Sequence, residues 1–410
     1  MGFLRGFLGR RLTTLGLASF ALGAAFIFSW LLVAAASPHL GVSHADDLAS
    51  KQFAVDFRDY WLAAGRMAGH ASPYNPAMLF GPIGSQGFDV YRYPPILAFL
   101  LIPLSGLDYV SAGWIWVGLS VPALIVGMVI SLQAGGTRLS PQVLIWTGAA
   151  TVWFLPTLDS LWKGNVESLQ VLLIALVLAG GAGARGGSIV AGAWRKVPPV
   201  LLVPALLVRD GRRGVAWLFG ASAILVVPAL IWAPDGFRQL PQILINISGA
   251  DSVVATNLAP SSWLTTLTGS SIVGEVARVA AIIAAFALVG LSIYLARRPQ
   301  GWAAAMLVGG SASLLLPGTI WEHYLLVLLP FGVYVWPRLS FEDKVWLTLA
   351  GAVVSGGGFI SSFAFLGAVA FVAIALKGLW PPAEQAEIST GGRLVIGQVE
   401  SGAAQDTLGL

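Results

Sequence analysis

The sequence predicts an all-helical, polytopic membrane protein with about twelve transmembrane helices. Of its 410 residues, 57% are hydrophobic and only 10% are charged, whereas an average soluble domain carries about 25% charged residues. The mean hydropathy is +0.80. Glycine (49 residues) and tryptophan (16 residues) are abundant, as they are in membrane helices and their interfacial belts. These three observations exclude a soluble globular protein.

Apolar runs give the expected helices. The runs cover about 12–36, 94–106, 111–132, 141–157, 166–184, 187–208, 214–233, 276–296, 301–317, 321–337, 344–360 and 361–379. The first run is longer than the apolar part of about 7–15 residues in a signal peptide, so we expect an uncleaved helix. Two runs fit poorly, because 94–106 would span only about 20 Å and 187–208 contains Lys196 and three prolines. If neither of these two runs is a standard transmembrane helix, the segment 158–167 lies on the opposite side of the membrane from the one that strict alternation gives.

Clusters of cations set the expected orientation, because Lys and Arg favour cytoplasmic loops. If the runs alternate, one side holds Arg5, Arg10, Arg11, Arg209, Arg212, Arg213, Arg297, Arg298, Arg338, Lys344 and Lys377. We therefore expect a plasma (inner) membrane protein with a cytoplasmic N-terminus and with the loops at about 37–93 and 234–275 outside. Residues 1–379 are expected to form the membrane-embedded domain, and residues 380–410 a polar, partly disordered cytoplasmic tail.

Several classes of function are disfavoured. The chain has no Cys and four His, so disulfides, thiol chemistry and Cys-based metal sites are excluded and a zinc cluster is not expected. Residues 181–186 match G-x-G-x-x-G, but they follow an apolar helix and not a strand. A P-loop, a D-x-D pair and a long cytosolic stretch are all missing, which argues against an ATP-driven pump or a nucleotide-sugar transferase. We expect no metal, no cofactor and no nucleic-acid partner.

The first outer loop contains two carboxylates one helical turn apart. Asp56 and Asp59 lie at the start of an expected helix over residues 57–68, and either could accept a proton from a substrate hydroxyl at the membrane surface. The alternative is structural, with Asp56 as the N-cap of that helix. The loop ends with Arg92 between two tyrosines, which suits a lipid phosphate. The same residues could also be an interfacial anchor.

Polar groups also interrupt the later apolar runs. Residues 159–167 form a polar island, and the run near 321 begins with Glu322 and His323. Such groups at bilayer depth are functional candidates, although an ordinary loop would also explain the island. His323 could bind a phosphate or a hydroxyl. Asn257, in a polar and aromatic part of the second outer loop, is a weaker candidate for contact with a sugar.

The order of these motifs resembles glycosyltransferase family 87, the polyprenol-phosphate-sugar-dependent transferases that include mycobacterial mannosyl- and arabinosyltransferases of the GT-C fold. The motifs are D-F-R-D-Y-W, Y-R-Y-P-P, G-N-V-E, K-V-P-P and W-E-H-Y, and the resemblance runs from about residue 50 to 337. Asp56 and Tyr60 match the D-x-x-x-Y context of the family's catalytic Asp. Lys196 matches a Lys-Pro element with one residue inserted. Gly-Asn-Val-Glu stands where the family has G-Q-x-N.

The resemblance implies a GT-C-type fold and an inverting sugar transfer, with an Asp as general base, on the extracytoplasmic side. The donor would be a polyprenyl-phosphate sugar, with mannose or an arabinose-like sugar, and the acceptor a lipid or glycan. The expected site residues are Asp56, Asp59 and His323 for catalysis, Arg92, Lys196 and His323 for the donor phosphate, and Tyr60, Tyr93, Asn165, Glu167, Glu322 and Asn257 for substrate. The alternatives are a flippase or carrier for a lipid-linked sugar and a lipid-linked polysaccharide ligase.

Overall fold

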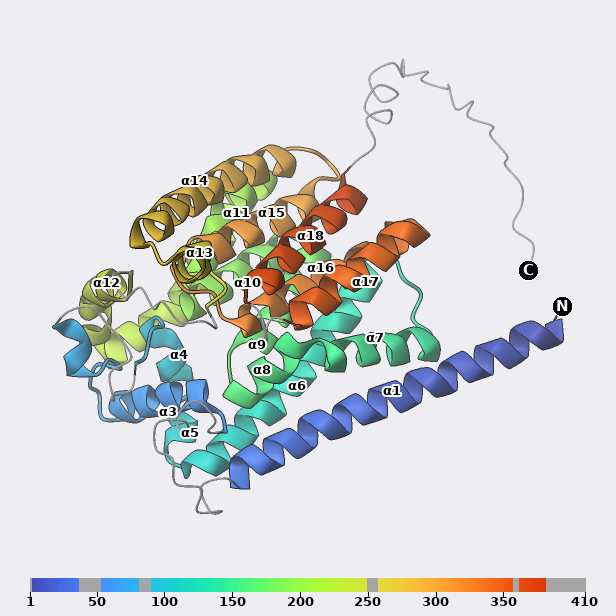
Figure 1. Cartoon of the computed structure of the whole chain (residues 1–410). Helices are drawn as coiled ribbons and strands as arrows, with labels where there is room; N and C mark the ends of the chain where they lie inside the picture. The colour runs from blue at the N-terminus through green and yellow to red at the C-terminus, as the bar shows by residue number, and fades with distance from the viewer. Residues whose placement is uncertain (1, 37–52, 81–89, 249–256, 357–360, 381–410) are drawn as a thin grey trace, which may run out of the picture. The chain divides into compact units, whose positions relative to one another are not determined.

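The computed structural model describes residues 2–36, 53–80, 90–248, 257–356 and 361–380, and these residues form helices joined by short connections (Figure 1). The helices are α1 (Gly2–Ala36), α3 (Val55–Ala68), η2 (Pro76–Leu79), α4 (Pro95–Leu100), α5 (Ile102–Ser105), α6 (Tyr109–Ala134), α7 (Pro141–Trp153), α8 (Leu155–Lys163), α9 (Glu167–Ala179), α10 (Ala182–Arg195), η3 (Pro198–Leu202), α11 (Val203–Trp232), α12 (Pro234–Ser248), α13 (Pro260–Thr268), α14 (Ser271–Ala296), α15 (Trp302–Leu315), η4 (Glu322–Leu328), α16 (Leu329–Val335), η5 (Trp336–Arg338), α17 (Phe341–Ser355) and α18 (Ser361–Leu379). Within these ranges there is no β-strand, so the predicted all-helical class is confirmed for this part of the chain.

Among the described residues, five helical ranges are long and apolar enough to cross a membrane. They are Arg11–Ala36, Tyr109–Ala134, Pro198–Trp232, Ser271–Ala296 and Ser362–Leu379. Two shorter apolar helices, Glu167–Ala179 and Trp302–Leu315, fall below the length required. A multi-pass membrane protein is therefore supported, whereas the predicted number of about twelve transmembrane helices is not confirmed.

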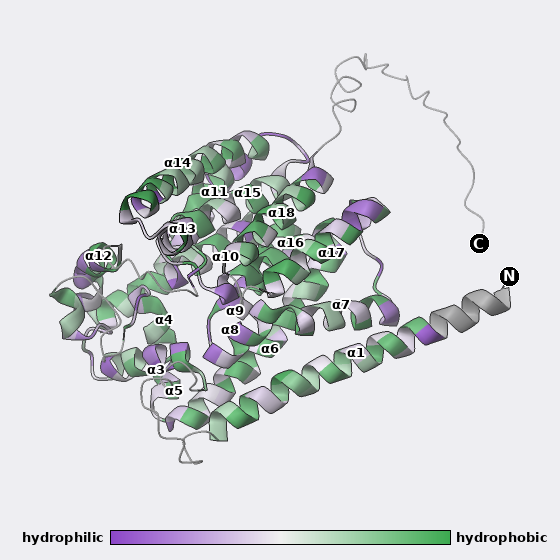
Figure 2. Ribbon diagram, viewed as in Figure 1, coloured by the Kyte–Doolittle hydropathy of each residue, from purple (hydrophilic) through white to green (hydrophobic). Residues whose placement is uncertain are grey.

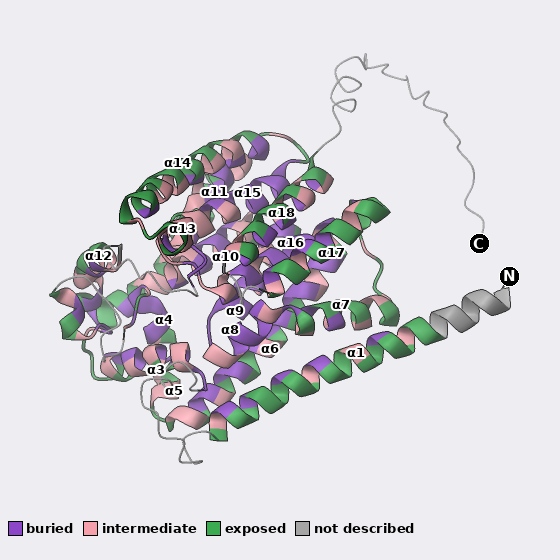
Figure 3. Cartoon of the chain, in the orientation of Figure 1, coloured by how far each residue is buried: buried purple, intermediate pink, exposed green. Residues whose placement is uncertain are grey.

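The long apolar helices turn hydrophobic side chains outward. Leu22 in α1 is 65% exposed and Phe286 in α14 is 62% exposed. Figure 2 shows α14 as predominantly hydrophobic, and Figure 3 shows much of the same helix as exposed. An apolar surface of this extent is unfavourable in water but is matched by lipid tails. These faces are therefore suited to contact with the membrane.

The two runs that fit poorly as transmembrane helices are both broken. The run 94–106 is divided between α4 and α5, and six helical residues extend only about 9 Å. It therefore contains no helix that crosses the hydrocarbon core. The run 187–208 is divided at Lys196, where the backbone is extended between α10 and η3. Prolines at the start of η3 and of α11 set this division, because proline is tolerated in the first turn of a helix but disrupts its interior.

Buried apolar side chains gather in two clusters. One includes α3, α4, the first half of α6 and α8, with Phe57, Tyr60 and Trp116 among its members. The other includes α9, α15, η4, α16 and α18, with Leu307 and Leu326 among its members. The polar residues described below come from elements of both clusters.

The chain divides by internal contacts into Met1–Leu379 and Trp380–Leu410. Of the second unit the structure describes only Trp380, so the expected partly disordered tail lies outside the described residues. Parts of the two predicted outer loops, 37–52, 81–89 and 249–256, lie outside them as well.

Candidate active site

The start of α3 places Asp56 at the site. The helix begins after Ala54, whose backbone is left-handed (φ 55°, ψ 42°). The Ala54 N–H donates to the Trp162 carbonyl at 2.7 Å, and the Ala54 carbonyl accepts from the Tyr109 hydroxyl at 2.7 Å. Asp56 is thus the second residue of the helix, and the interpretation of Asp56 as N-cap is wrong. Strained backbone of this kind persists where its surroundings fix it, and it is common at functional sites.

A glycine turn brings Asn165 to Asp56. Gly164 ends α8 with φ 65°, and a Cβ there would lie 2.8 Å from the Phe57 Cβ and 3.0 Å from the Ala54 Cβ. Glycine is therefore required both by the backbone conformation and by the close approach of α3. The turn lets the Asn165 amide Nδ2 donate to Asp56 Oδ2 at 2.7 Å.

His323 is buried at the start of η4 and joins this pair. Its Nε2 lies 2.9 Å from Asn165 Nδ2 and 3.8 Å from Asp56 Oδ2. Its Nδ1 lies 2.8 Å from Asp159 Oδ2. His323 thus lies with Asp56 and Asn165, and both of its ring nitrogens have polar neighbours within the protein.

Asp159 and Lys163 lie one turn apart on α8 and form an ion pair at 3.0 Å. Burial alone would raise the pKa of Asp159, but His323 and Lys163 together lower it to about 2. The same pairing outweighs burial for Lys163 and raises its pKa. Both groups are thus charged at neutral pH. Sequence reasoning placed them in the polar island without a role, although their i, i+4 spacing was a usable signal.

A cavity of about 550 Å³ opens beside these residues. It is lined by Val55, Asp56, Asp59, Tyr60, Val90, Arg92, Tyr93, Asp159, Trp162, Lys163, Asn165, Leu258, Trp321, Glu322, His323 and Tyr324. Its volume falls in the range of about 300–1,000 Å³ that is usual for small-molecule sites. The structure therefore brings together eight of the eleven predicted site residues, from Asp56 to His323, around one cavity.

Tyrosines form one wall of this cavity. The Tyr60 hydroxyl donates to the Tyr93 hydroxyl at 3.0 Å, and the two rings meet edge to face. Burial raises the pKa of both hydroxyls well above the usual range, and the nearby Asp56 adds to the rise. The tyrosines therefore stay protonated and present neutral hydrogen-bonding groups beside the carboxylate.

Glu322 adds a carboxyl group with an unusual environment. One of its oxygens, Oε1, is buried without a hydrogen-bond partner in the described part of the chain. Burial raises the pKa of Glu322 to about 7, with Asp159 adding to the rise and Lys163 opposing it. Near neutral pH this group can therefore be either a hydrogen-bond donor or an acceptor toward a ligand.

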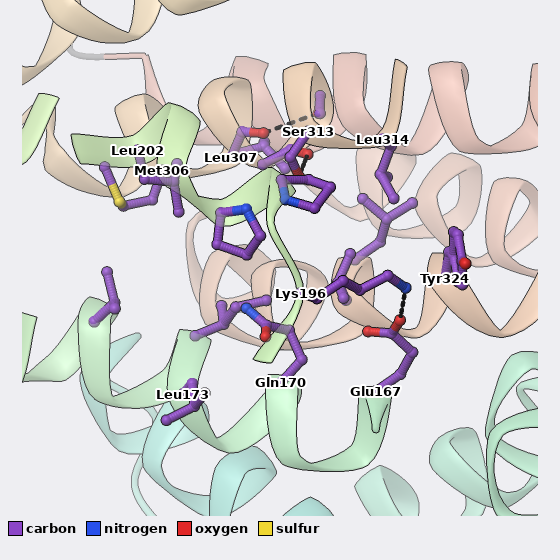
Figure 4. Close-up of a pocket in the computed structure, with 18 of the residues that line it drawn as sticks. Glu167, Gln170, Leu173, Lys196, Leu202, Met306, Leu307, Ser313, Leu314 and Tyr324 are labelled. Atoms are coloured by element: carbon purple, nitrogen blue, oxygen red, sulfur yellow. Dashed lines mark hydrogen bonds and ion pairs between the residues drawn. The ribbon is translucent and has the colours of Figure 1, made fainter. Parts of the chain in front are cut away.

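The predicted pair Glu167 and Lys196 lies at a second, narrower cavity of about 60 Å³. Figure 4 shows the two side chains pointing toward each other, with a dashed line between them. The Lys196 ammonium also lies 3.1 Å from the centre of the Tyr324 ring. Most other lining residues are apolar and come from α9, η3, α15 and η4. Lys196 is thus a paired cation at the end of an apolar cavity, and Tyr324 borders both cavities.

Asn257 does not take the predicted place at a substrate. Its Oδ1 accepts from the backbone N–H groups of Ala259 and Ile320, and its Nδ2 donates to the Gly318 carbonyl. The side chain therefore ties two connections together. Its backbone neighbour Leu258 lines the larger cavity.

The arrangement suits proton transfer next to a polar ligand. Asp56 has a side chain that is 32% exposed, which allows a hydroxyl to reach it, and Asn165 and His323 fix its position. Arg92 and Lys163 supply positive charge at the same cavity. Among the described residues, no group of three or more His, Asp or Glu side chains could share a metal ion.

Comparison with known proteins gives a family match. The model of glycosyltransferase family 87 matches residues 91–317. A segment of 127 residues is 32% identical to part of a protein named GPI mannosyltransferase 1 from Kluyveromyces lactis. That segment covers 30% of this chain and 27% of the relative, so the chain spans about a quarter of the length of the curated protein that it matches.

Proposed function

Because the chain belongs to glycosyltransferase family 87, we propose that it transfers a sugar from a polyprenyl-phosphate carrier to a hydroxyl group of a lipid or glycan acceptor. Residues 1–379 form the catalytic domain, and the reaction takes place on the extracytoplasmic side of the membrane. Mannose is the first sugar to test, since the curated relative is named a mannosyltransferase. The observation that carries the proposal is the partly exposed Asp56 carboxylate, held by Asn165 at a polar cavity.

The reaction proceeds by inversion with Asp56 as general base. The acceptor hydroxyl gives its proton to Asp56 as its oxygen forms a bond to the anomeric carbon. The bond from that carbon to the phosphate oxygen breaks, and the electron pair leaves with the polyprenyl phosphate. The Asp59 carboxylate lines the same cavity but does not match the D-x-x-x-Y context of the family's catalytic Asp, so it ranks second as the base.

Positive charge at the cavity assists the leaving group. Arg92 is exposed and lines the cavity, and a guanidinium group binds phosphate through two parallel hydrogen bonds. Lys163 is the second cation at this cavity. Both stabilise negative charge that grows on the phosphate in the transition state. We assign the donor phosphate to this region and assign His323 to the base.

The second cavity suits the carrier lipid. Its walls are mainly aliphatic, and its polar end, formed by Glu167, Lys196 and Tyr324, adjoins the larger cavity. The volume of this second cavity, about 60 Å³, is too small for a polyprenyl chain, so only the apolar group next to the phosphate would enter it, close to Lys196. An apolar cavity next to a polar one supports an amphiphilic donor better than a nucleotide sugar, which has no apolar chain to bury.

The test uses purified protein with matched donors. We expect transfer of the sugar from a polyprenyl-phosphate donor in the presence of a chelator, and no transfer from the corresponding nucleotide sugar. Turnover of the nucleotide sugar alone, or dependence on a divalent ion, would refute the proposal. Movement of an intact lipid-linked sugar across vesicles without transfer would favour a carrier, and transfer of a whole glycan would favour a ligase.

A further inference from the structure

Asp159 makes the hydrogen bond that decides which nitrogen of His323 carries a proton. Its Oδ2 lies 2.8 Å from His323 Nδ1, and Lys163 Nζ lies within 3.1 Å of both of its oxygens. A carboxylate that pairs with an ammonium group is ionised and can only accept hydrogen bonds. His323 Nδ1 is therefore the donor.

The other ring nitrogen is then fixed as an acceptor. Asn165 Nδ2 lies 2.9 Å from His323 Nε2 and 2.7 Å from Asp56 Oδ2. The amide nitrogen has two hydrogens, so it donates one to each neighbour. The opposite orientation of the Asn165 amide would place its oxygen against the Asp56 carboxylate, which is repulsive. One assignment of protons thus fits every contact from Asp159 through His323 and Asn165 to Asp56, and it leaves Asn165 Oδ1 buried without a hydrogen-bond partner among the described residues.

We propose that Asp159 is a positioning residue for the glycosyl transfer: it holds His323 neutral, with the proton on Nδ1, so that Nε2 accepts from Asn165 and orients the Asp56 carboxylate. The inference rests on the proposed function for its kinetic consequence. Asp159 acts on the base through two other side chains and does not touch substrate. A histidine oriented by a carboxylate in this way is a recurrent device in enzymes.

Charged and titratable groups face His323 from three elements. Asp56 faces it from α3, Asp159 and its partner Lys163 from α8, and Glu322 and Tyr324 adjoin it on η4. Lys163 Nζ pairs with both Asp159 oxygens, so part of the negative charge beside the ring is compensated. An imidazolium ring would direct a second N–H at the amide hydrogens of Asn165, which would require that amide to turn.

The first test is nuclear magnetic resonance of the full-length protein with ¹⁵N-labelled histidine. The chain has four histidines, and the His323 signals are those lost in His323→Gln. At pH 7 we expect a neutral ring protonated on Nδ1. An imidazolium ring, or a ring protonated on Nε2, would overturn the proposal. This measurement needs neither substrate nor a variant of Asp159.

The second test is Asp159→Asn, whose amide can present a hydrogen to Nδ1 and so shift the proton to Nε2. We expect kcat to fall about 10²- to 10⁴-fold with little change in KM, and the His323 signals to move toward the other tautomer. The control is Asp343→Asn, which breaks the 2.8 Å ion pair of Asp343 with Lys377 between α17 and α18. That variant should keep both kcat and the wild-type signals.

The outcomes separate this proposal from the proposed function. Unchanged kcat and unchanged tautomer in Asp159→Asn would overturn the positioning role. If that variant does not fold, the tautomer of the wild-type protein decides. If the wild-type protein transfers no sugar from any donor, the proposed function fails, whereas the resonance measurement still tests the assigned protons.

Discussion

Asp56 and Asn165 are 109 residues apart in the sequence, and the Asn165 amide donates a hydrogen bond of 2.7 Å to the Asp56 carboxylate. The bond connects the first turn of α3 with the connection between α8 and α9. It fixes the orientation of a carboxylate that is one-third exposed. A general base requires both properties, since it must be held in place and yet be reached by the hydroxyl.

The first prediction concerns Asp56 as the base. Asp56→Asn keeps the size of the side chain but removes the proton acceptor, so we expect transferase activity to fall about 10²- to 10⁴-fold. Thermal stability in detergent should stay near that of the wild type. Asp59→Asn, one turn further along α3, is the matched control and should retain most activity. An active Asp56→Asn variant with an inactive Asp59→Asn variant would reverse the assignment.

The second prediction concerns the turn that delivers Asn165. Gly164→Ala places a Cβ 2.8 Å from the Phe57 Cβ in α3 and 3.0 Å from the Ala54 Cβ just before that helix. It also puts the new side chain on a left-handed backbone, which costs about 1–2 kcal/mol by itself. We expect a lower Tm together with a loss of activity. The control is Gly220→Ala within α11, where a Cβ meets no atom within 4 Å. Equal effects of the two substitutions would show that the close approach of Gly164 is unimportant.

The sequence predicts the helical class and half of the residues that line the cavity, because composition and local motifs carry that information. Asp56, Arg92 and His323 were each found in short polar motifs within an apolar chain. The partners of these residues were harder to predict. Asp159 and His323 are 164 residues apart, and neither motif indicates the other.

The expected topology of the apolar runs is the main reason why these partners are hard to predict from the sequence. Strict alternation of twelve runs places residues 158–167 on the side opposite to Asp56, which hides the contact between them. The contact is compatible with the topology when α4 and α5, which are too short to cross a membrane, are not counted as a crossing. Asn257 shows a different limit of sequence reasoning: a polar side chain in a loop has the same sequence signature whether it binds a ligand or ties the backbone.

The third prediction concerns Lys196 and Glu167. The Glu167 side chain is only 2% exposed, so Lys196→Gln leaves a buried carboxylate without its partner, at a cost of about 3–5 kcal/mol. The double variant Lys196→Gln with Glu167→Gln should therefore unfold at a higher temperature than Lys196→Gln. Arg238→Gln breaks the exposed pair of Arg238 with Asp235 and should leave Tm unchanged. A single variant as stable as the double variant would contradict the prediction.

The fourth prediction concerns the pH dependence of stability. Burial raises the pKa of Glu322 to about 7, above the value of about 4.3 in an unfolded chain. The folded state therefore binds the Glu322 proton more tightly than the unfolded state does. This protonation stabilises the fold at low pH, and the stabilisation is lost as the pH rises toward 7. Glu322→Gln cannot titrate. We expect the Tm of the wild type to fall relative to that of Glu322→Gln as the pH rises from about 4 to 7. Parallel Tm profiles would exclude the raised pKa.

The fifth prediction concerns the side of the membrane reached by each connection. The site holds Asp159 and Asn165 against Asp56 and His323, so residues 158–167 lie on the same side as the start of α3. The chain between these two segments contains α6 and α7. α6 is long enough to cross the membrane, whereas α7 alone is not. If α6 crosses and α7 together with the start of α8 returns, the connection at 135–140 lies on the opposite side, with the cations near 209–213. Arg138 in that connection agrees with a cytoplasmic location.

Single cysteines test this arrangement directly, because the chain contains no Cys. Ala71 and Leu139 are exposed positions in two connections, and Arg212 is exposed within α11, next to Gly211, where the helix is broken (φ 52°, ψ −131°). In intact cells, an impermeant thiol reagent should label Ala71→Cys but not Leu139→Cys or Arg212→Cys. All three should react after permeabilisation, which controls for access to each thiol. Labelling of both Ala71→Cys and Leu139→Cys in intact cells would restore the alternation in which residues 94–106 cross the membrane. Labelling of Arg212→Cys alone would reverse the orientation and place the site on the cytoplasmic side.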